Sequence, residues 1–346
     1  MPYPEIDNKG FCLQGVCIQS IWVIYTMANI KDLLKIESYD SIRSILFSAG
    51  ELGQKENVEV YVVGGFVRDL LMGRPINDID IMIVGEGIPF AKKLAVKLGK
   101  KKVIPFKKFG TALIPNNDLQ IEVATARTEA YEDDSRKPSK VIYTDLKGDL
   151  LRRDFTINAM AMDIHPSRFG DLTDPFGGIS DIENKILRTP LDPDETFSED
   201  PLRMMRAAYF ASKLGFQIEQ RCRNSIKDQA YRIDIVSMER IRDEFIKILN
   251  TKKPSIGLVI LQKTGLMKIV FPEIHVMYGM DQTSEWHHKD IFAHTLQVVD
   301  NSAELSDKME IRFSALVHDI AKPNTRRIDK NKGYTFHGHD AVGERM

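Results

Sequence analysis

A short run of mostly β-branched residues, Val58 to Val63, ends at the glycine pair Gly64-Gly65. β-Branched residues favour strands and paired glycines favour tight turns, so the pattern predicts a strand, a turn and then a helix over Phe66 to Met72. A second apolar run, Ile79 to Val84, stops at Gly85 and predicts another strand. Strands separated by helices are typical of a mixed α/β domain.

The same signals extend this α/β head to about residue 165. Its further expected elements are helices over 31–56 and 89–98 and strands over Thr111–Ile114 and Leu119–Ala124. After Pro190 the chain becomes helical, over 201–250 and 255–268, and strand signals are few. We therefore expect four parts: an N-terminal extension over 1–27 that folds poorly, a head over 28–165, a helical neck over 166–250 and a helical body over 251–346.

The N-terminal segment from Gly10 to Ile30 carries no charge and nearly has the length of a membrane span. Polar residues interrupt it and no basic cluster precedes it, so we expect neither a membrane anchor nor a signal peptide. Met27 is an alternative start, with 1–26 as an upstream extension. The cysteines are too few and too scattered for a disulfide framework, which indicates a reducing, cytoplasmic setting.

The first candidate site combines the glycine turn with nearby charged residues. Glycines between a strand and a helix let backbone amides approach a phosphate, and Arg68 lies one turn into that helix. Asp78 and Asp80 stand two apart at the start of a strand, so both carboxylates project to one face. Two such carboxylates are the smallest protein ligand set that suits Mg²⁺. An Asp-x-Asp pair is, however, often only the solvent-exposed start of a strand.

Two other segments extend this site. Glu122 lies in an apolar strand and faces away from the side of Ile121 and Val123; it is either a third metal ligand or a solvent-facing acid on an edge strand. The segment Arg152–Met160 opens with two arginines followed by an acid, a pattern that suits a triphosphate or ordinary surface charge.

Taken in order, these segments resemble the class II tRNA nucleotidyltransferase (CCA-adding enzyme) and poly(A) polymerase family. The matching segments are Gly64–Asp69 with Asp78 and Asp80, Glu122–Arg127, Arg152–Met160, Asp174–Asp181 and Glu199–Ala207. Several motifs in the right order are far more specific than one short pattern. The resemblance implies a polymerase-β-like nucleotidyltransferase head (a mixed sheet with helices), followed by an all-α neck and body and a partial HD-type helical domain.

The resemblance also implies roles for individual residues. Asp78 and Asp80 would bind Mg²⁺, with Glu122 as the third catalytic carboxylate. The nucleotide-binding residues would be Gly64, Gly65, Arg68, Arg153, Asp200, Arg203 and Arg206. The implied substrates are CTP and ATP, and the implied partner is tRNA.

Asp200 and Arg203 are the residues that the resemblance assigns to base reading. They are three apart on an expected helix, hence on one face. A carboxylate accepts from the amino group of cytosine or adenine, whereas uracil and guanine present a carbonyl there; an arginine donates to the neighbouring ring acceptor. An ordinary ion pair between the two residues is the alternative. Tyr209 stands where the family commonly has another arginine, which removes an expected cationic contact.

A separate signal lies near the C-terminus. His294 and the pair His318-Asp319 resemble an HD-type metal-dependent phosphohydrolase module, and histidine with carboxylate suits a transition metal. Such modules normally close with a further aspartate, and the chain ends at Met346, so we expect this part to be truncated. The alternative is a domain kept for helical packing and tRNA contact.

The leading hypothesis is therefore Mg²⁺-dependent, template-independent addition of C and A to the tRNA 3′ end. A poly(A) polymerase or an enzyme that adds only CC or only A shares all of these motifs. An HD phosphohydrolase or a non-catalytic tRNA-binding protein is disfavoured by the intact Asp78 and Asp80 pair. We expect no membrane partner, and the sequence does not indicate the oligomeric state.

The charge distribution agrees with an RNA substrate. The chain has 48 basic and 49 acidic residues, which excludes a uniformly basic nucleic-acid-binding coat. Residues 60–160, however, hold 17 basic and 13 acidic side chains, and Ala91–Phe109 contains eight lysines and no acid. This run is either a solvated helix face or part of a track for the RNA backbone.

Overall fold

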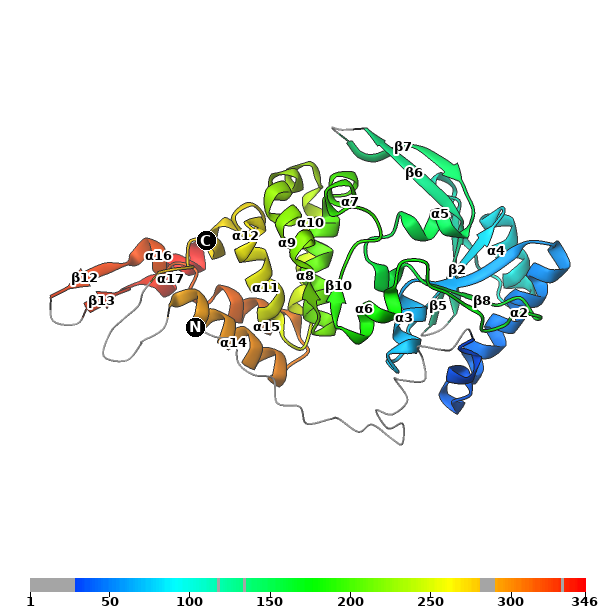
Figure 1. Ribbon diagram of the computed structural model, residues 1–346. Helices are drawn as coiled ribbons and strands as arrows, with labels where there is room; N and C mark the ends of the chain where they lie inside the picture. Colours follow the sequence, from blue (N-terminus) through cyan, green and yellow to red (C-terminus); the bar gives the residue numbers. More distant parts are fainter. Residues whose placement is uncertain (1–28, 117–118, 133–134, 281–289, 331–332) are drawn as a thin grey trace.

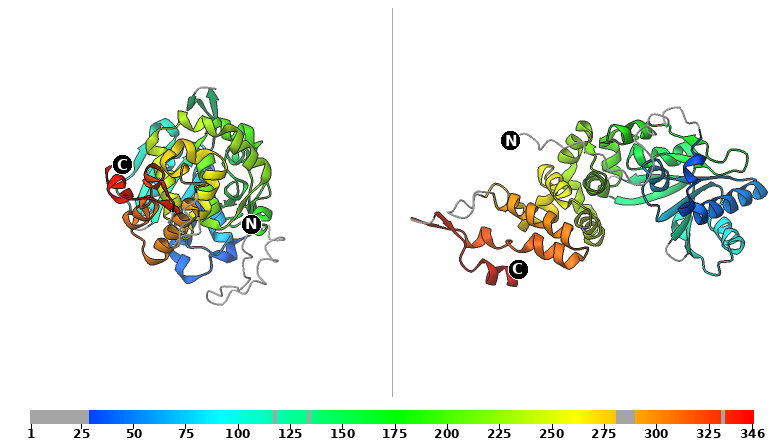
Figure 2. Two further views of the ribbon diagram at one scale, coloured as in Figure 1. Left: turned by 90° about the vertical axis from the view of Figure 1, so that its left-hand side faces the viewer. Right: turned by 90° about the horizontal axis from the view of Figure 1, so that it is seen from below.

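The computed structural model describes residues 29–116, 119–132, 135–280, 290–330 and 333–346. The molecule is elongated, with the α/β head at one end, helices in the middle and a short hairpin at the far end (Figure 1). The view from below in Figure 2 shows the same succession of head, helical layers and hairpin. The predicted fold class is confirmed, while the prediction for residues 1–27 lies outside the described residues.

The head contains one seven-stranded mixed sheet in the order β3-β4-β5-β2-β1-β8-β9. Its strands are β1 (Glu59–Val63), β2 (Asp78–Val84), β3 (Ile104–Phe106), β4 (Thr111–Asn116), β5 (Leu119–Thr125), β8 (Ala161–Asp163) and β9 (Leu172–Thr173). The helices of the head are α2 (Asp40–Glu56), α3 (Gly65–Leu71), α4 (Gly87–Lys97) and α5 (Leu146–Leu151). The pairing of β2 with β5 is parallel and places Asp80 directly beside Glu122.

The apolar periodicity of the head explains its packing. In β5 the exposed Glu122 alternates with the buried Ile121 and Val123, as the strand period requires. In α2 the buried residues recur at helical spacing, from Ile42 through Leu46 to Leu52, and the residues of the opposite face are exposed to solvent. These faces form one apolar core between the sheet and its helices.

A two-stranded hairpin beside the sheet was not predicted. Strands β6 (Arg127–Glu132) and β7 (Ser135–Tyr143) pair in antiparallel fashion and project from the head (Figure 1). Their sequence is rich in charged residues and lacks the apolar alternation of a half-buried strand. The sequence pattern therefore does not reveal this pairing.

The rest of the chain is mainly helical. Its helices are α6 (Gly178–Glu183), α7 (Pro193–Glu199), α8 (Leu202–Leu214), α9 (Gln220–Gln229), α10 (Met238–Leu249), α11 (Pro254–Lys263), α12 (Leu266–Val270), α13 (Pro272–His275), α14 (Ile291–Leu305), α15 (Met309–Val317), α16 (Lys322–Thr325) and α17 (His339–Arg345). Its short strands are β10 (Ile186–Leu187), β11 (Gln217–Ile218), β12 (Arg327–Asp329) and β13 (Gly333–Thr335), of which the β12–β13 hairpin was also not predicted.

The helical part has a core of its own. Phe155 and Ile157, from the segment that follows α5, are fully buried in that core although the chain returns to the head sheet at β8. The ring of Phe155 meets Phe210 of α8 edge-on, with 5.8 Å between centroids. The segment after α5 thus joins the head to the helices.

None of the helices within the described ranges combines the length and the apolar character that crossing a membrane requires.

Candidate nucleotidyltransferase site and HD cluster

The acidic residues of the first candidate site meet at the centre of the head sheet. Asp78 and Asp80 lie on one face of β2, and the register brings Glu122 of β5 onto the same face beside Asp80. Burial raises the pKa of Asp80, and the charge of Asp78 adds to this against the attraction of Arg153. Burial, followed by the charge of Asp80, likewise raises the pKa of Glu122. The carboxylates therefore crowd one another.

This crowding fits a divalent cation. Carboxylate oxygens are the donors that Mg²⁺ prefers, and a cation among them would oppose the burial and the mutual repulsion that raise the pKa values of Asp80 and Glu122. Asp80 and Glu122 also line a cavity of about 690 Å³, so a ligand reaches them from solvent. The donor set suits a hard cation better than a transition metal, because it contains no nitrogen or sulfur.

The glycine turn lies against the same carboxylates. Gly64 has a φ of +69°, and a Cβ at this position would lie 2.7 Å from Nη1 of Arg153 and 3.7 Å from Oδ2 of Asp80. A side chain there would therefore displace Arg153 from its place beside Asp80. Glycine is needed both for the left-handed backbone and for this close approach.

Asp149 fixes both arginines of the motif, a role that the sequence analysis missed. Its Oδ1 accepts from Arg152 at 2.6 Å, and its Oδ2 accepts from Arg153 at 3.0 Å. Although burial opposes ionisation, these two arginines hold the pKa of Asp149 below its usual value. The spacing of three and four residues was the available signal, because such pairs share one helix face.

A chain of polar contacts runs from α3 to α8. Arg68 donates to Oδ1 of Asn158 at 2.6 Å, and Nδ2 of Asn158 donates to Oδ1 of Asp154 at 3.0 Å. Oδ2 of Asp154 accepts from Nε and Nη2 of Arg206 at 2.8 and 2.5 Å. The structure thus gives Arg68 and Arg206 partners within the protein.

Phe210 of α8 adds an aromatic contact to this chain. Arg68 and Arg206 each lie over its ring, 5.3 and 5.2 Å from the centroid. Arg68 is also only 3% exposed and forms an ion pair with Asp69. Its position favours a role in holding the turn against α8.

The expectation that Asp200 and Arg203 share a helix is wrong. Asp200 has extended backbone dihedral angles at the end of α7, and α8 begins only at Leu202. Pro201 separates Asp200 from the helix, because the residue before a proline is disfavoured in helical geometry.

The ion pair between Asp200 and Arg203, the alternative interpretation, is likewise not formed. Asp200 pairs with Arg240 of α10 at 3.1 Å, and Arg203 pairs with Glu199 at 2.9 Å. Arg203 also donates to the carbonyls of Thr196 and Arg152. Both residues line the large cavity.

Tyr209 lines the same cavity. Lys213, one turn further along α8, places its Nζ 5.6 Å from the centroid of the Tyr209 ring. Lys247 of α10 lines the cavity beside them. Two lysines therefore supply positive charge near the position where the family commonly has arginine.

The lysine-rich segment is partly neutralised within the head. Lys93 and Lys97 of α4 form ion pairs with Glu56 and Glu51 of α2, the latter at 2.6 Å. Several of the other lysines, Lys92, Lys100, Lys101, Lys102 and Lys107, are wholly or partly exposed. Part of the run is therefore an intramolecular salt-bridge surface.

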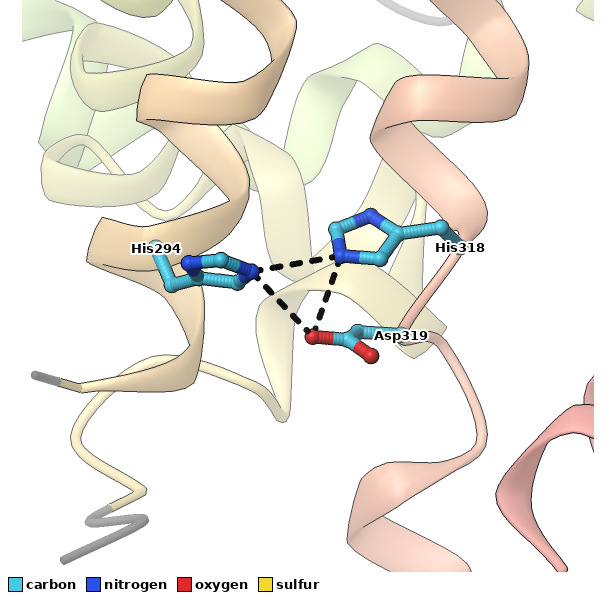
Figure 3. Close-up of side chains that lie close together, drawn as sticks. All are labelled: His294, His318 and Asp319. Atoms are coloured by element: carbon cyan, nitrogen blue, oxygen red, sulfur yellow. Dashed lines mark hydrogen bonds and ion pairs between the residues drawn. The ribbon is translucent and has the colours of Figure 1, made fainter. Parts of the chain in front are cut away.

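The histidines and the aspartate that the sequence singled out near the C-terminus form a compact cluster. His294 comes from α14, whereas His318 and Asp319 follow α15, and the three side chains converge (Figure 3). Nε2 of His318 lies 3.4 Å from Nε2 of His294 and 3.1 Å from Oδ2 of Asp319. One ligand atom from each residue lies within 4.8 Å of the others, a spacing that fits a single metal ion.

Asp319 is held in its charged form. Although burial opposes ionisation, hydrogen bonds from His318 and Lys322 lower its pKa to about 2. His339 of α17 approaches the other oxygen, with 3.6 Å between Nε2 and Oδ1. The nitrogen and carboxylate donors fit a transition metal.

Comparisons with known proteins agree with this arrangement. Three family models match: the Poly A polymerase head domain over residues 60–188, a probable RNA and SrmB-binding site of polymerase A over 215–278, and the HD domain over 291–346. A multifunctional CCA protein of Shewanella frigidimarina is 38% identical over 297 residues, which are 83% of this chain and 67% of the relative. The chain spans 64 to 67% of the length of the curated relatives that it matches.

Solved structures give the same result. A CCA-adding enzyme in complex with CTP has 29% identity and a TM-score of 0.64, with 80% of this chain and 60% of that chain covered. A tRNA nucleotidyltransferase with a primer tRNA and an incoming ATP analogue has 29% identity and a TM-score of 0.62, with 78% and 75% covered. The fold, the order of the motifs and the relatives all agree, and the chain therefore belongs to the family of the CCA-adding enzymes and poly(A) polymerases.

Proposed function

We propose that the protein is a template-independent tRNA nucleotidyltransferase that adds C and A to the tRNA 3′ end from CTP and ATP and releases pyrophosphate. One observation carries this proposal: a single cavity joins Asp80 and Glu122 of the sheet to Asp200, which precedes α8, and Arg203 in the first turn of α8. Relatives named for CCA addition, and related structures with CTP and with a primer tRNA, support it. The cytoplasm, which holds these substrates, is the compartment that we infer.

The carboxylate end of the cavity would hold the reacting groups. Asp78, Asp80 and Glu122 are the proposed ligands of Mg²⁺, which when bound supplies positive charge to the phosphate oxygens and activates the terminal hydroxyl. The pKa of both Asp80 and Glu122 is raised, so these residues ionise more completely as the pH increases. Metal affinity should accordingly increase with pH through the acidic range.

The glycine turn and Arg153 would hold the triphosphate. Gly64 and Gly65 bring backbone amides to the N-terminus of α3, where an anion is favoured. Arg153 adds a guanidinium that Asp149 already orients. Because this arginine needs no reorganisation when a nucleotide enters, its charge acts fully on the phosphates.

The other end of the cavity would select the base. Asp200 would accept a hydrogen bond from the amino group of cytosine or adenine. Within the part of the chain that the structure describes, Arg203 commits three N–H groups, to Thr196, Glu199 and Arg152. Two of its five donors therefore remain for the acceptor on the base ring.

End sequencing of tRNA tests the proposal. The protein is incubated with Mg²⁺ and tRNAs that lack A, CA or CCA, and each nucleotide is supplied singly. We expect C on the ends that lack CCA and a single A on the end that lacks A. Long runs of A would indicate a poly(A) polymerase, addition of only C or only A would indicate a partial enzyme, and no incorporation from any nucleotide would contradict nucleotidyl transfer by this chain.

A second candidate function follows from the cluster of His294, His318 and Asp319. The convergence of these three ligands favours a metal-dependent phosphohydrolase in the C-terminal part of the chain. His294 and His318 would supply neutral imidazoles, and Asp319 a carboxylate. This site lies outside the large cavity, so the two activities would be independent.

Metal analysis and hydrolysis test this candidate. Purified protein is dialysed against Mn²⁺, Co²⁺ or Ni²⁺, and we expect one bound ion that is lost in His294→Ala, together with hydrolysis of p-nitrophenyl phosphate. Double replacement of Asp78 and Asp80 by alanine should abolish nucleotide incorporation and leave hydrolysis intact. Hydrolysis that survives His294→Ala would show that the cluster is not responsible.

A further inference from the structure

The large cavity continues beyond Arg206 into a region that the proposed roles do not use. Here α8 and α10 run side by side, and Tyr209, Lys213, Glu244 and Lys247 line the wall. A smaller hollow of about 200 Å³ adjoins it and shares Tyr209, Lys213 and Lys247. A nucleotide that binds at Asp200 and Arg203 would lie directly beside this wall.

Glu244 is the unusual residue of this region. It is only 4% exposed, and its Oε1 accepts a hydrogen bond from Nζ of Lys247 at 2.7 Å. Its Oε2 is buried and has no hydrogen-bond partner among the described residues. A buried carboxylate oxygen without a donor is costly, so such an atom beside a cavity calls for a donor from a ligand or water.

The neighbouring side chains in the described part of the chain leave Oε2 of Glu244 without a hydrogen-bond donor. Arg206 faces it from α8, but its Nε and Nη2 are directed to Asp154. Although burial disfavours the charged guanidinium, Asp154 and then Glu244 hold the pKa of Arg206 above its ordinary value. Arg206 thus interacts electrostatically with Glu244 but donates its hydrogen bonds to Asp154, which leaves Oε2 of Glu244 open as an acceptor.

We propose that Glu244 is a specificity-determining residue whose Oε2 accepts a hydrogen bond from an N–H or O–H donor of the nucleotide bound in the cavity. This inference rests on the proposed function. Cytidine and adenosine nucleotides offer two such donors, the amino group of the base and the ribose hydroxyls. Lys247 fixes the carboxylate through Oε1, so that Oε2 is presented in one orientation.

Replacement by glutamine distinguishes this role from a structural one. In Glu244→Gln the amide oxygen would stay with Lys247, and the amide nitrogen would take the place of Oε2. A donor would then face the donor of the nucleotide. We expect the Kd of CTP and ATP to increase by about 10-fold or more, with the melting temperature little changed.

The matched control is Glu239→Gln on the same helix, since Glu239 is exposed and outside the cavity. The nucleotide Kd is measured by equilibrium dialysis, which needs no turnover, and KM and kcat by incorporation into tRNA. If Glu244→Gln does not fold, Glu244→Asp takes its place, because it keeps the charge and withdraws the acceptor by one methylene. A Kd within twofold of that of the wild type in the folded variant would overturn the inference.

Substrate analogues identify the donor. If a ribose 2′-hydroxyl is bound, 2′-deoxy-CTP will bind weakly to the wild type and Glu244→Gln will weaken it no further. If the base amino group is bound, Glu244→Gln will weaken CTP more than UTP. A fall in kcat and melting temperature with unchanged nucleotide Kd would show a structural role only. Failure of the wild type to extend tRNA, with nucleotide binding intact, would contradict the proposed function and leave this inference standing.

Discussion

Asp80→Asn is expected to reduce nucleotide incorporation by at least about 10³-fold without destabilising the protein. Asparagine keeps the shape of the side chain but removes the charge that a divalent cation requires. Because burial and Asp78 raise the pKa of Asp80, its ionised form disfavours the folded state, increasingly as the pH rises through that pKa. The neutral variant should therefore melt at the same temperature as the wild type, or higher, at neutral pH in the absence of metal.

The control for this prediction is Asp228→Asn. Asp228 is exposed on α9, so the same change of charge should alter neither incorporation nor stability. Rates are measured with CTP and tRNA that lacks CCA, and melting temperatures by circular dichroism in EDTA. Incorporation that persists in Asp80→Asn within tenfold of the wild type would contradict the assignment of the metal ligands.

Asp154→Ala is expected to lower both stability and activity. Although burial opposes ionisation, Arg206 holds the pKa of Asp154 below its usual value, so the carboxylate stabilises the fold above its unfolded pKa, and this contribution is lost as the pH falls through the folded pKa. Removing it leaves Arg206 without its partner. We expect a loss of about 2 kcal/mol, less than a fully buried pair would give because the Arg206 side chain is 33% exposed.

Activity should fall further than stability suggests. Asp154 also accepts from Asn158, which in turn accepts from Arg68 beside the glycine turn. Without the Asp154 carboxylate, α8 can shift relative to Asp80 and Glu122 of the sheet. A displacement of about 1 Å at a reacting centre can lower the rate about 10²-fold.

Urea denaturation and incorporation kinetics measure these effects. Arg206→Gln and the double variant complete a thermodynamic cycle, which should give a favourable coupling between the two residues. Asp40→Ala, which breaks the exposed ion pair with Arg43, should change the free energy of unfolding by no more than about 0.5 kcal/mol. Additive effects of Asp154→Ala and Arg206→Gln would show that the pair does not stabilise the junction.

The sequence predicted that Asp78 and Asp80 share one face of a strand because their spacing follows the simple period of a strand. Asp78 and Asp80 alternate along one strand, and Glu122 stands out within an apolar strand. The local order of strand, glycine turn and helix likewise depends on neighbouring residues, so it could be predicted without tertiary information. The family resemblance then supplied the order of the domains.

Contacts that depend on tertiary packing escaped prediction. Asp149 could have been found from its spacing to Arg152 and Arg153, but nothing local marks Glu244, which meets the cavity only because α10 packs beside α8. The prediction that Asp200 and Arg203 share one helix was wrong because Pro201 lies between Asp200 and the helix. This proline could have been noticed in the sequence. One partner of Arg68 was likewise hidden, since Asn158 is distant in the sequence.

The burial of Phe155 and Ile157 in the helical core also bears on synthesis at the ribosome. Strand β1 completes its pairing only with β8, which follows these two residues directly, so the head sheet can close soon after they emerge. Their apolar partners, including Phe210, are made later. A nascent chain whose head sheet has already formed therefore exposes the side chains of Phe155 and Ile157 to solvent. They become covered only after α8 has left the exit tunnel of the ribosome.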